Sequence, residues 1–266
     1  MSTIPFPAAL AAGPLVALAA WRAGLLDARA SLAAAVIGSA AAVAGTDWVA
    51  LLLTFFGTSV ALGRAGRARK QARTAAVLDD ERARTARQVV ANGALFATGA
   101  VLGVTGLVPL PLARTGALGA LAAATADTWA TEIGLWLGGM PRSVVTGRPL
   151  APGLSGGVTI AGTLGSVGGA ALLGALALAC GWSRPVAIAV TVGGVLGSLA
   201  DSLLGASLQA RRRAADGTIT ERARDVHGAA TMHATGLRWL DNDVVNFAAT
   251  GTGAVVALAT FALLRP

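Results

Sequence analysis

Three carboxylates stand inside long apolar stretches of the sequence. Asp127 and Glu132 lie in the apolar segment 112–138, and Asp201 lies in the segment 184–207. A charged side chain at the centre of a membrane helix costs about 2.5–3.5 kcal/mol, so a sequence keeps one where an ion, a polar partner or water compensates. Interhelical hydrogen bonds or ion pairs are the purely structural explanation. Because lysine and arginine are confined to loops and segment ends, we favour a functional site.

The two carboxylates of segment 112–138 do not share a helix face. Asp127 and Glu132 are five residues apart, which separates them by about 140° around an ideal helix. Either the helix is distorted between them, or each carboxylate has its own partner. Asp127 is therefore the stronger candidate for a metal ligand, and Glu132 is the candidate for holding a neighbouring helix or an arginine.

Other polar residues stand at the ends of further apolar segments. Gln88 and Asn92 begin the segment 88–108, one helical turn apart. Asn242, Asp243 and Asn246 begin the segment 244–264 in the same way. These side chains add amide oxygens and a further carboxylate to the candidate ligands.

Glycine has two notable positions. Ser155, Gly156 and Gly157 lead into the segment 156–180, where a glycine-rich helix start would present free backbone N–H groups and the positive end of the helix dipole to a phosphate. In the segment 184–207, glycines recur every four residues on the stripe of Asp201, which ends at Gln209. Such a stripe lets a neighbouring helix or a ligand approach closely.

The composition indicates a membrane protein. Of the 266 residues, 55% are hydrophobic and only 13% are charged, whereas roughly 25% are charged in a soluble domain. The single cysteine, Cys180, excludes an internal disulfide and a cysteine-rich metal site, and two histidines, His227 and His233, cannot form a typical zinc centre unaided. The net charge of +8 does not indicate a nucleic-acid partner, because the basic residues lie between apolar segments.

Eight apolar segments predict an all-α polytopic membrane protein, with one integral membrane domain over residues 1–266. The segments are roughly 5–21, 31–46, 48–63, 88–108, 112–138, 156–180, 184–207 and 244–264. The loops 22–30, 64–87, 139–155 and 208–243 hold every lysine and arginine except Arg114, Arg184 and Arg265. By the positive-inside rule, both termini are outside, and the basic loops 64–87 and 208–243 are cytoplasmic, where they meet anionic membrane lipids. Whether 31–46 and 48–63 both span stays open, since a re-entrant pair fits their short length.

This topology brings the polar residues to one side of the membrane. Asn92, Asp201, Asn246 and Gly156 lie toward the cytoplasmic ends of their segments, and Asp127 lies in the cytoplasmic half of its own. Carboxylates with amide and hydroxyl oxygens suit Mg²⁺, which keeps several waters and shares substrate phosphates. Nearby arginines would bind the remaining phosphate oxygens. The sequence therefore predicts metal-assisted phosphate chemistry at the cytoplasmic face of the cell membrane, on a lipid whose tail lies among the helices.

Five motifs, in this order along the chain, resemble one membrane family. They are ARQVVANG (86–93), ADTWATEIG (126–134), LSGGVTIAGTLGS (154–166), DSLLGASLQ (201–209) and NDVVNF (242–247). The family is domain of unknown function 92, which includes animal transmembrane protein 19 and the plant chloroplast phytyl-phosphate kinase. The resemblance covers nearly the whole chain. It implies a kinase that converts an isoprenoid monophosphate, of polyprenyl or phytyl type, to its diphosphate with a nucleoside triphosphate and Mg²⁺.

We combine this resemblance with the chemistry to assign candidate roles. Asp127, Asp201 and Asp243 are the candidate ligands of Mg²⁺ or of its waters, and Glu132 is a further catalytic candidate. The phosphate- and nucleotide-binding candidates are Arg87, Gln88, Asn92, Ser155, Gly156, Gly157, Ser202, Gln209, Asn242 and Asn246. A lipid monophosphate is already an anionic nucleophile, so positioning and charge neutralisation can replace a strong general base.

Two other functions, a second enzyme activity and transport, fit the same residues. A CTP-dependent cytidylyltransferase would use the same metal and phosphate groups to make a CDP-lipid. An ion-coupled lipid or solute transporter would use the buried acids for coupling, although the one-sided motifs and the lack of visible inverted repeats favour the enzyme. A purely structural membrane protein is the least favoured reading. The choice of CTP or ATP, the isoprenoid and its chain length stay open, and so does a homodimer.

Reporter fusions test the predicted topology. Reporters that work only in the cytoplasm should be active within 64–87 and 208–243 and inactive at both termini. Losing or gaining one helix would reverse this alternation of sides. A cytoplasmic signal from either terminus would contradict the count of eight segments.

Overall fold

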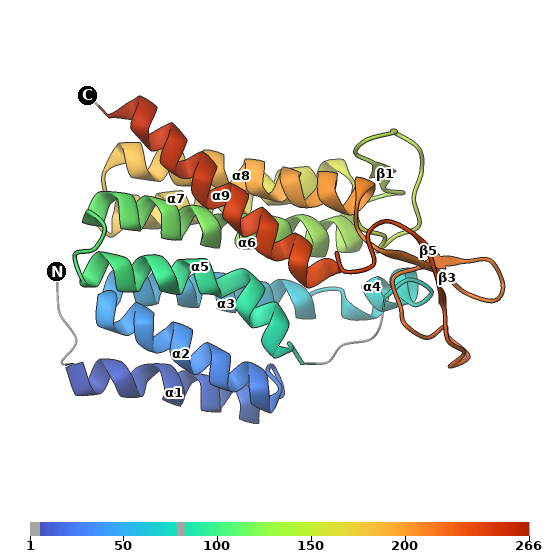
Figure 1. The fold of residues 1–266 in the computed structure, drawn as a ribbon, viewed down its shortest axis with the longest axis horizontal. Coiled ribbons are helices and arrows are strands. Elements are labelled where there is room, and N and C mark those ends of the chain that lie inside the picture. Colours follow the sequence, from blue (N-terminus) through green and yellow to red (C-terminus); the bar gives the residue numbers. More distant parts are fainter. Residues whose placement is uncertain (1–5, 79–82, 266) are drawn as a thin grey trace.

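The computed structural model describes residues 6–78 and 83–265. Within them the long helices are α1 (Phe6–Arg22), α2 (Ala28–Ala44), α3 (Thr46–Arg64), α5 (Ala86–Val104), α6 (Leu110–Leu137), α7 (Ile160–Ala179), α8 (Arg184–Ser207) and α9 (Asn242–Leu264), and the short helix α4 (Arg67–Thr74) follows α3. The long helices form one bundle (Figure 1). Each of them coincides with one predicted apolar segment to within a few residues.

The bundle has the surface of a membrane protein. Among the described helices, α3, α7, α8 and α9 are long and apolar enough to cross a membrane, and α1 and α2 are shorter apolar helices. Large apolar side chains stand exposed on the outside, such as Leu164 (68% exposed) and Val255 (66%). The prediction of a helical membrane protein is confirmed, whereas the eight spans and their orientation stay predictions.

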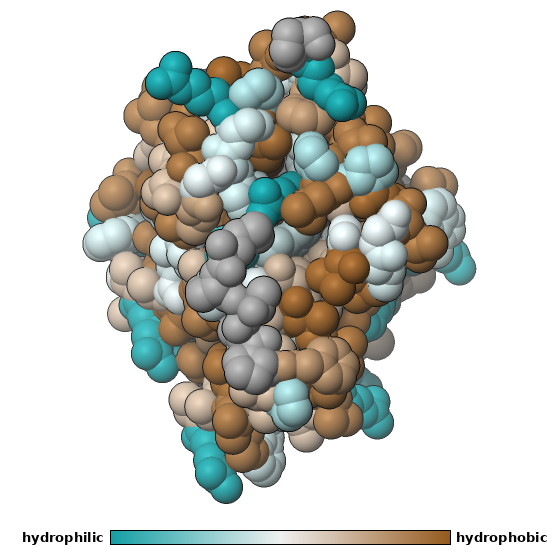
Figure 2. All heavy atoms as spheres, turned by 90° about the vertical axis from the view of Figure 1, so that its left-hand side faces the viewer, coloured by the Kyte–Doolittle hydropathy of each residue, from teal (hydrophilic) through white to brown (hydrophobic). Residues whose placement is uncertain are grey.

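The connections between helices separate into two ends of the bundle (Figure 1). The short α2–α3, α5–α6 and α7–α8 turns lie at one end, here called the turn end, together with the start of α1 and the end of α9. The other end, here called the loop end, carries α4 and all the labelled strands. Figure 2 views the turn end, where apolar residues surround a few polar ones. The predicted basic loops therefore share one end of the bundle.

Two small sheets form at the loop end. β1 (Arg142–Ser143) pairs antiparallel with β2 (Gly157–Val158), and β3 (Arg211–Arg213) lies between β4 (Ile219–Thr220) and β5 (Met232–Thr235). The all-α prediction is therefore wrong for the loops. Backbone N–H and C=O groups outside the helices also need hydrogen-bond partners, and strand pairing supplies them here. In the loop 64–87, α4 is described, and residues 79–82 lie outside the described residues.

Helix α6 is the centre of the bundle. Its residues 117–126 are all buried, and it packs against α5, α7, α8 and α9. A Cβ on Gly197 of α8 would lie 2.5 Å from the Cβ of Ala123 and 2.9 Å from the carbonyl oxygen of Ala249 on α9. Gly197 thus leaves α6 and α9 room to approach α8. Of the glycine stripe predicted for the segment 184–207, Gly193 faces α9 and Gly197 faces both helices, whereas Gly205 faces Ser155 and Gly156 in the loop before α7.

A partly buried ion pair joins three elements at the turn end. Oδ2 of Asp47 on α3 accepts hydrogen bonds from the indole N–H of Trp182 at 2.7 Å and from Arg114 of α6 at 3.3 Å. The guanidinium of Arg114 lies 4.7 Å from the centroid of the Trp182 ring. The side chains of Asp47 and Arg114 are 11% and 17% exposed. This cluster holds α3, α6 and the α7–α8 turn together.

Asp47→Ala should destabilise the bundle by on the order of 3 kcal/mol, because it removes the carboxylate that binds both Arg114 and the Trp182 indole in a largely buried position. Asp47→Asn keeps an oxygen for the Trp182 indole and should cost less. Thermal unfolding of the purified protein in detergent, followed by tryptophan fluorescence, measures both changes. Asp216→Ala, at an exposed loop position, is the control, and equal midpoints for Asp47→Ala and this control would contradict the expectation.

Candidate functional site

A cavity of about 1340 Å³ lies at the loop end. Its walls come from α3 to α9 and from the loops before α7 and after α8. Every site residue predicted from the sequence lines it: Arg87, Gln88, Asn92, Asp127, Glu132, Ser155, Gly156, Gly157, Asp201, Ser202, Gln209, Asn242, Asp243 and Asn246. The fold therefore gathers, around one cavity, residues that are spread over more than half of the sequence.

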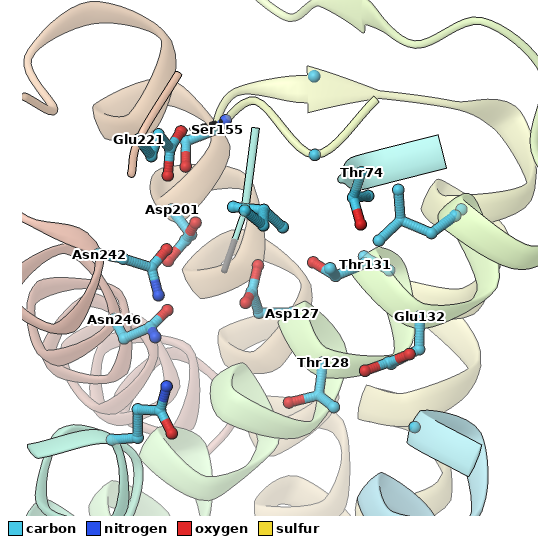
Figure 3. Close-up of a pocket in the computed structure, with 18 of the residues that line it drawn as sticks. Thr74, Asp127, Thr128, Thr131, Glu132, Ser155, Asp201, Glu221, Asn242 and Asn246 are labelled. Atoms are coloured by element: carbon cyan, nitrogen blue, oxygen red, sulfur yellow. Dashed lines mark hydrogen bonds between the residues drawn. The ribbon is translucent and has the colours of Figure 1, made fainter. Parts of the chain in front are cut away.

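Asp127 of α6 and Asp201 of α8 converge in this cavity. They follow the packed residues Ala123 and Gly197 by one helical turn each, so the close approach of the two helices brings the carboxylates together. Their charges are near enough to interact. In Figure 3, Asp127 points into the cavity and Asp201 points toward Asn242 of α9. Among the described residues, Oδ2 of Asp201 is buried without a hydrogen-bond partner.

The oxygens around Asp201 fit Mg²⁺. This ion is commonly held by one or two carboxylates together with substrate phosphates and water. Asp127 and Asp201 supply two carboxylates, and Asn242 and Asn246 line the same cavity. The unpartnered oxygen of Asp201 is an atom that a metal ion or its water would satisfy.

Asp243 stands apart from this carboxylate pair. In the part of the chain that the structure describes, no three Asp, Glu, His or Cys side chains group as a metal site. Asp243 instead lies 3.4 Å from Arg87, which also binds Asp241 at 2.6 Å. The three predicted metal ligands Asp127, Asp201 and Asp243 thus line one cavity without forming a three-carboxylate group.

Glu132 lies on another face of α6 and binds α4. The ammonium of Lys70 donates to Oε2 of Glu132 at 2.5 Å and to the carbonyls of Leu62 and Gly63 at 2.6 and 3.1 Å. Lys70 is only 6% exposed. α6 is continuous from Leu110 to Leu137, so Glu132 binds Lys70 and Asp127 points into the cavity from one unbroken helix. In this structure Glu132 anchors α4 to α6.

The pair Gly156–Gly157 does not open a helix. α7 begins at Ile160 and is capped by Thr159. Gly156 has φ +81°, and a Cβ there would clash with the backbone of Ala206 on α8. The prediction of a glycine-rich helix start is therefore wrong, because this glycine allows a left-handed turn whose backbone rests on α8. Both glycines nevertheless line the cavity.

Glu221, which sequence reasoning missed, ties the loop 208–243 to the cavity. Its carboxylate accepts hydrogen bonds from the backbone N–H of Ser155 at 2.7 Å and from the Gln209 amide at 3.0 Å. The same amide donates to the Ser155 hydroxyl at 2.9 Å. Burial raises the pKa of Glu221, against opposing effects of Ser155 and Arg211. No periodic pattern in this polar loop marks Glu221, so the sequence offered no signal for it.

Basic side chains surround the acidic centre. Arg87 has a side chain that is 63% exposed and pairs with Asp241. Gln88 makes a capping box with Thr85 at the start of α5. The other arginines that line the cavity are Arg64, Arg67, Arg84, Arg212, Arg222 and Arg238. A cavity that is lined by both carboxylates and arginines suits a phosphate that binds together with a metal cation.

Comparison with known proteins agrees with the motifs. Residues 11–254 match the model of the integral membrane protein family DUF92. The chain belongs to this family. An uncharacterized membrane protein of Methanocaldococcus jannaschii is 35% identical over 162 residues, which cover 61% of this chain and 65% of that protein. Protein PGR of Arabidopsis thaliana is 28% identical over 265 residues, with 88% of each chain covered. No solved structure matches the chain.

Glu221→Gln should change how stability depends on pH. Because burial raises the pKa of Glu221 above its ordinary value of 4.5, the unfolded chain loses this proton at lower pH than the folded chain. The contribution of Glu221 to stability therefore falls as the pH rises from 4.5 through the folded-state pKa. The midpoint of thermal unfolding is measured for wild type and variant from about pH 4 to about pH 8. As the pH rises, the midpoint of wild type should fall relative to that of the variant. A difference that is independent of pH would contradict the burial of this charge.

Proposed function

We propose that this protein is a membrane kinase that converts an isoprenoid monophosphate to its diphosphate with a nucleoside triphosphate. The supporting observation is one cavity in which the Asp127–Asp201 pair, the Asn242 and Asn246 amides and several arginines lie together at the end of an apolar bundle. Carboxylates and arginines together suit a phosphate that binds with a divalent cation. The surrounding apolar helices suit a substrate with a hydrocarbon tail.

In the proposed reaction, an oxygen of the lipid phosphate attacks the γ-phosphorus of the nucleotide. The new P–O bond forms as the bond from the γ-phosphorus to the bridging oxygen breaks, and the nucleoside diphosphate leaves with that electron pair. The lipid phosphate is ionised before it reacts, so no side chain has to remove a proton. The site residues therefore act by position and charge.

The side chains have separate tasks in this scheme. Asp127 and Asp201 would hold Mg²⁺, with the amides of Asn242 and Asn246 orienting the phosphates beside them. When bound, the ion supplies charge neutralisation on the transferring phosphoryl group. Arginines that line the cavity would hold the other phosphate oxygens. The apolar helices keep the lipid tail out of water.

Transport is less favoured, because the candidate residues gather at the loop end of the bundle, whereas alternating access usually places the site near the membrane midplane. A cytidylyltransferase would use the same cavity, but its lipid phosphate would attack the α-phosphorus and release pyrophosphate. The two reactions give different lipid products, a diphosphate and a CDP-lipid. Product analysis therefore separates them.

Asp201→Asn should reduce transfer by about 100-fold or more, because it removes a charge that acts on the transferring group. The assay uses purified protein in lipid nanodiscs, labelled ATP or CTP, Mg²⁺ and a panel of phytyl and polyprenyl monophosphates, with chromatography of the lipid products. Wild type should make a lipid diphosphate, and a chelator should stop the reaction.

Asp216→Asn, at an exposed loop position, is the matched control and should retain wild-type activity. Full activity of Asp201→Asn would remove Asp201 from the site. A CDP-lipid as the product would replace the kinase by a cytidylyltransferase. No turnover with any pair of lipid phosphate and nucleotide would refute the proposed enzyme.

A further inference from the structure

A second, apolar cavity adjoins the polar one. It has a volume of about 110 Å³, lies between α1, α2, α3 and α5, and is here called the apolar groove. Arg84, Gln88 and Asn92 line both the apolar groove and the polar cavity. The two cavities therefore meet at these three side chains, with apolar walls on one side and the acidic centre on the other.

Small residues give the apolar groove its room. On its α1 and α2 walls stand Ala17, Gly13, Ala34 and Gly38, among others. A Cβ on Gly38 would lie 3.0 Å from the Cα of Gly13, so the two helices touch there and form a fixed back wall. The groove follows α2 from Ala34 to Ala42, about 12 Å at the rise of an α-helix. It is thus an elongated slot parallel to the helices.

Arg84 is fixed at the junction of the two cavities. Its backbone N–H donates to the carbonyl of Leu25, and its carbonyl accepts from the N–H of Asp27, each at 3.0 Å. Its guanidinium lies 5.9 Å from the centroid of the Phe55 ring. Within residues 6–78 and 83–265 this guanidinium donates no hydrogen bond, and Glu132, whose charge reaches it, is already bonded to Lys70.

We propose that the apolar groove holds the part of the hydrocarbon tail next to the phosphate in a prenyl monophosphate whose phosphate binds Arg84 and Asn92 at the junction. This inference rests on the proposed function and places its lipid substrate. A free phosphate would leave the groove without an occupant, and a hydrocarbon alone would leave the Arg84 guanidinium at the junction without an anion. A molecule with one phosphate end and an apolar body satisfies both.

The placement also gives the lipid phosphate a direction. Gln88 and Asn92 stand one turn apart on α5 and line both cavities. A phosphate beside them faces the polar cavity that contains Asp127 and Asp201. The reacting oxygen would then point toward the nucleotide, while the tail extends away from it between α1 and α2.

Photolabelling tests this placement. The probe is a geranylgeranyl monophosphate with a diazirine on the isoprene unit next to the phosphate, bound to the full chain in lipid nanodiscs, and the labelled peptides are mapped by mass spectrometry. Label is expected in α1, α2, α3 or α5. Geranylgeranyl phosphate should compete with it, whereas inorganic phosphate and geranylgeraniol at equal concentration should not.

Substitutions in the groove and at Arg84 sharpen the result. Ala34→Phe fills the groove and should lower labelling by about tenfold or more, since the tail loses its apolar contacts. Val36→Phe, on the same helix at a position that is 70% exposed, is the matched control and should label like wild type. Arg84→Gln should weaken competition by geranylgeranyl phosphate about tenfold, with partial recovery in Arg84→Lys. If Ala34→Phe does not fold, Ala34→Leu makes the same test with a smaller change.

Label confined to α7–α9, or equal competition by geranylgeraniol, would overturn the inference. Unchanged labelling of a folded groove-filling variant would do the same. Groove labelling that the monophosphate competes, without any diphosphate product, would leave the lipid site standing and refute the kinase. Diphosphate formation with label outside the groove would refute the lipid placement alone.

Discussion

The contact between α6 and α8 at Ala123 and Gly197 determines where the carboxylates of the candidate site lie. Any side chain at 197 would meet Ala123 and the α9 backbone, so the helices can approach only because that position is glycine. Residues four apart lie on one helix face, and this contact therefore forces Asp127 and Asp201 together one turn further on. In lipid, helix association depends on packing rather than on the hydrophobic effect. The same small residues thus build the bundle and the acidic centre.

The two carboxylates of α6 show how the chain tolerates charge at this depth. Glu132 is neutralised by Lys70, whose ammonium also satisfies two backbone carbonyls at the end of α3. No cation pairs with Asp127 within the described part of the chain, and its side chain points into the cavity (Figure 3). Glu132 therefore stabilises the packing of α4 on α6, and Asp127 points into the cavity. This division explains why acidic residues so near in sequence have unrelated environments.

Hydropathy and loop charge predicted the helices and the gathering of polar residues, since both follow from local patterns of apolar and basic residues. The 140° separation predicted either a distorted helix or different partners for Asp127 and Glu132, and α6 is one unbroken helix in which Glu132 binds Lys70. Gly156 was misread because glycine serves helix starts, left-handed turns and close packing alike, and only the contact with Ala206 distinguishes them. Glu221 and strands β3 to β5 could not be predicted, because their pairing depends on residues distant along the chain.

The position of the polar cavity limits the chemistry that the proposed reaction can use. Its arginines Arg212, Arg222 and Arg238 lie in the segment between α8 and α9, so in the proposed reaction a charged nucleotide would enter the cavity from the loop end. A lipid phosphate, by contrast, must keep its tail among apolar side chains while its phosphate reaches the same cavity. Arg84 stands between the two environments, with its backbone fixed by the α1–α2 turn and its guanidinium over Phe55. An arginine fixed there can bind the phosphate of a lipid without drawing its tail into water, and this is the arrangement that transfer between a soluble and a membrane-bound substrate requires.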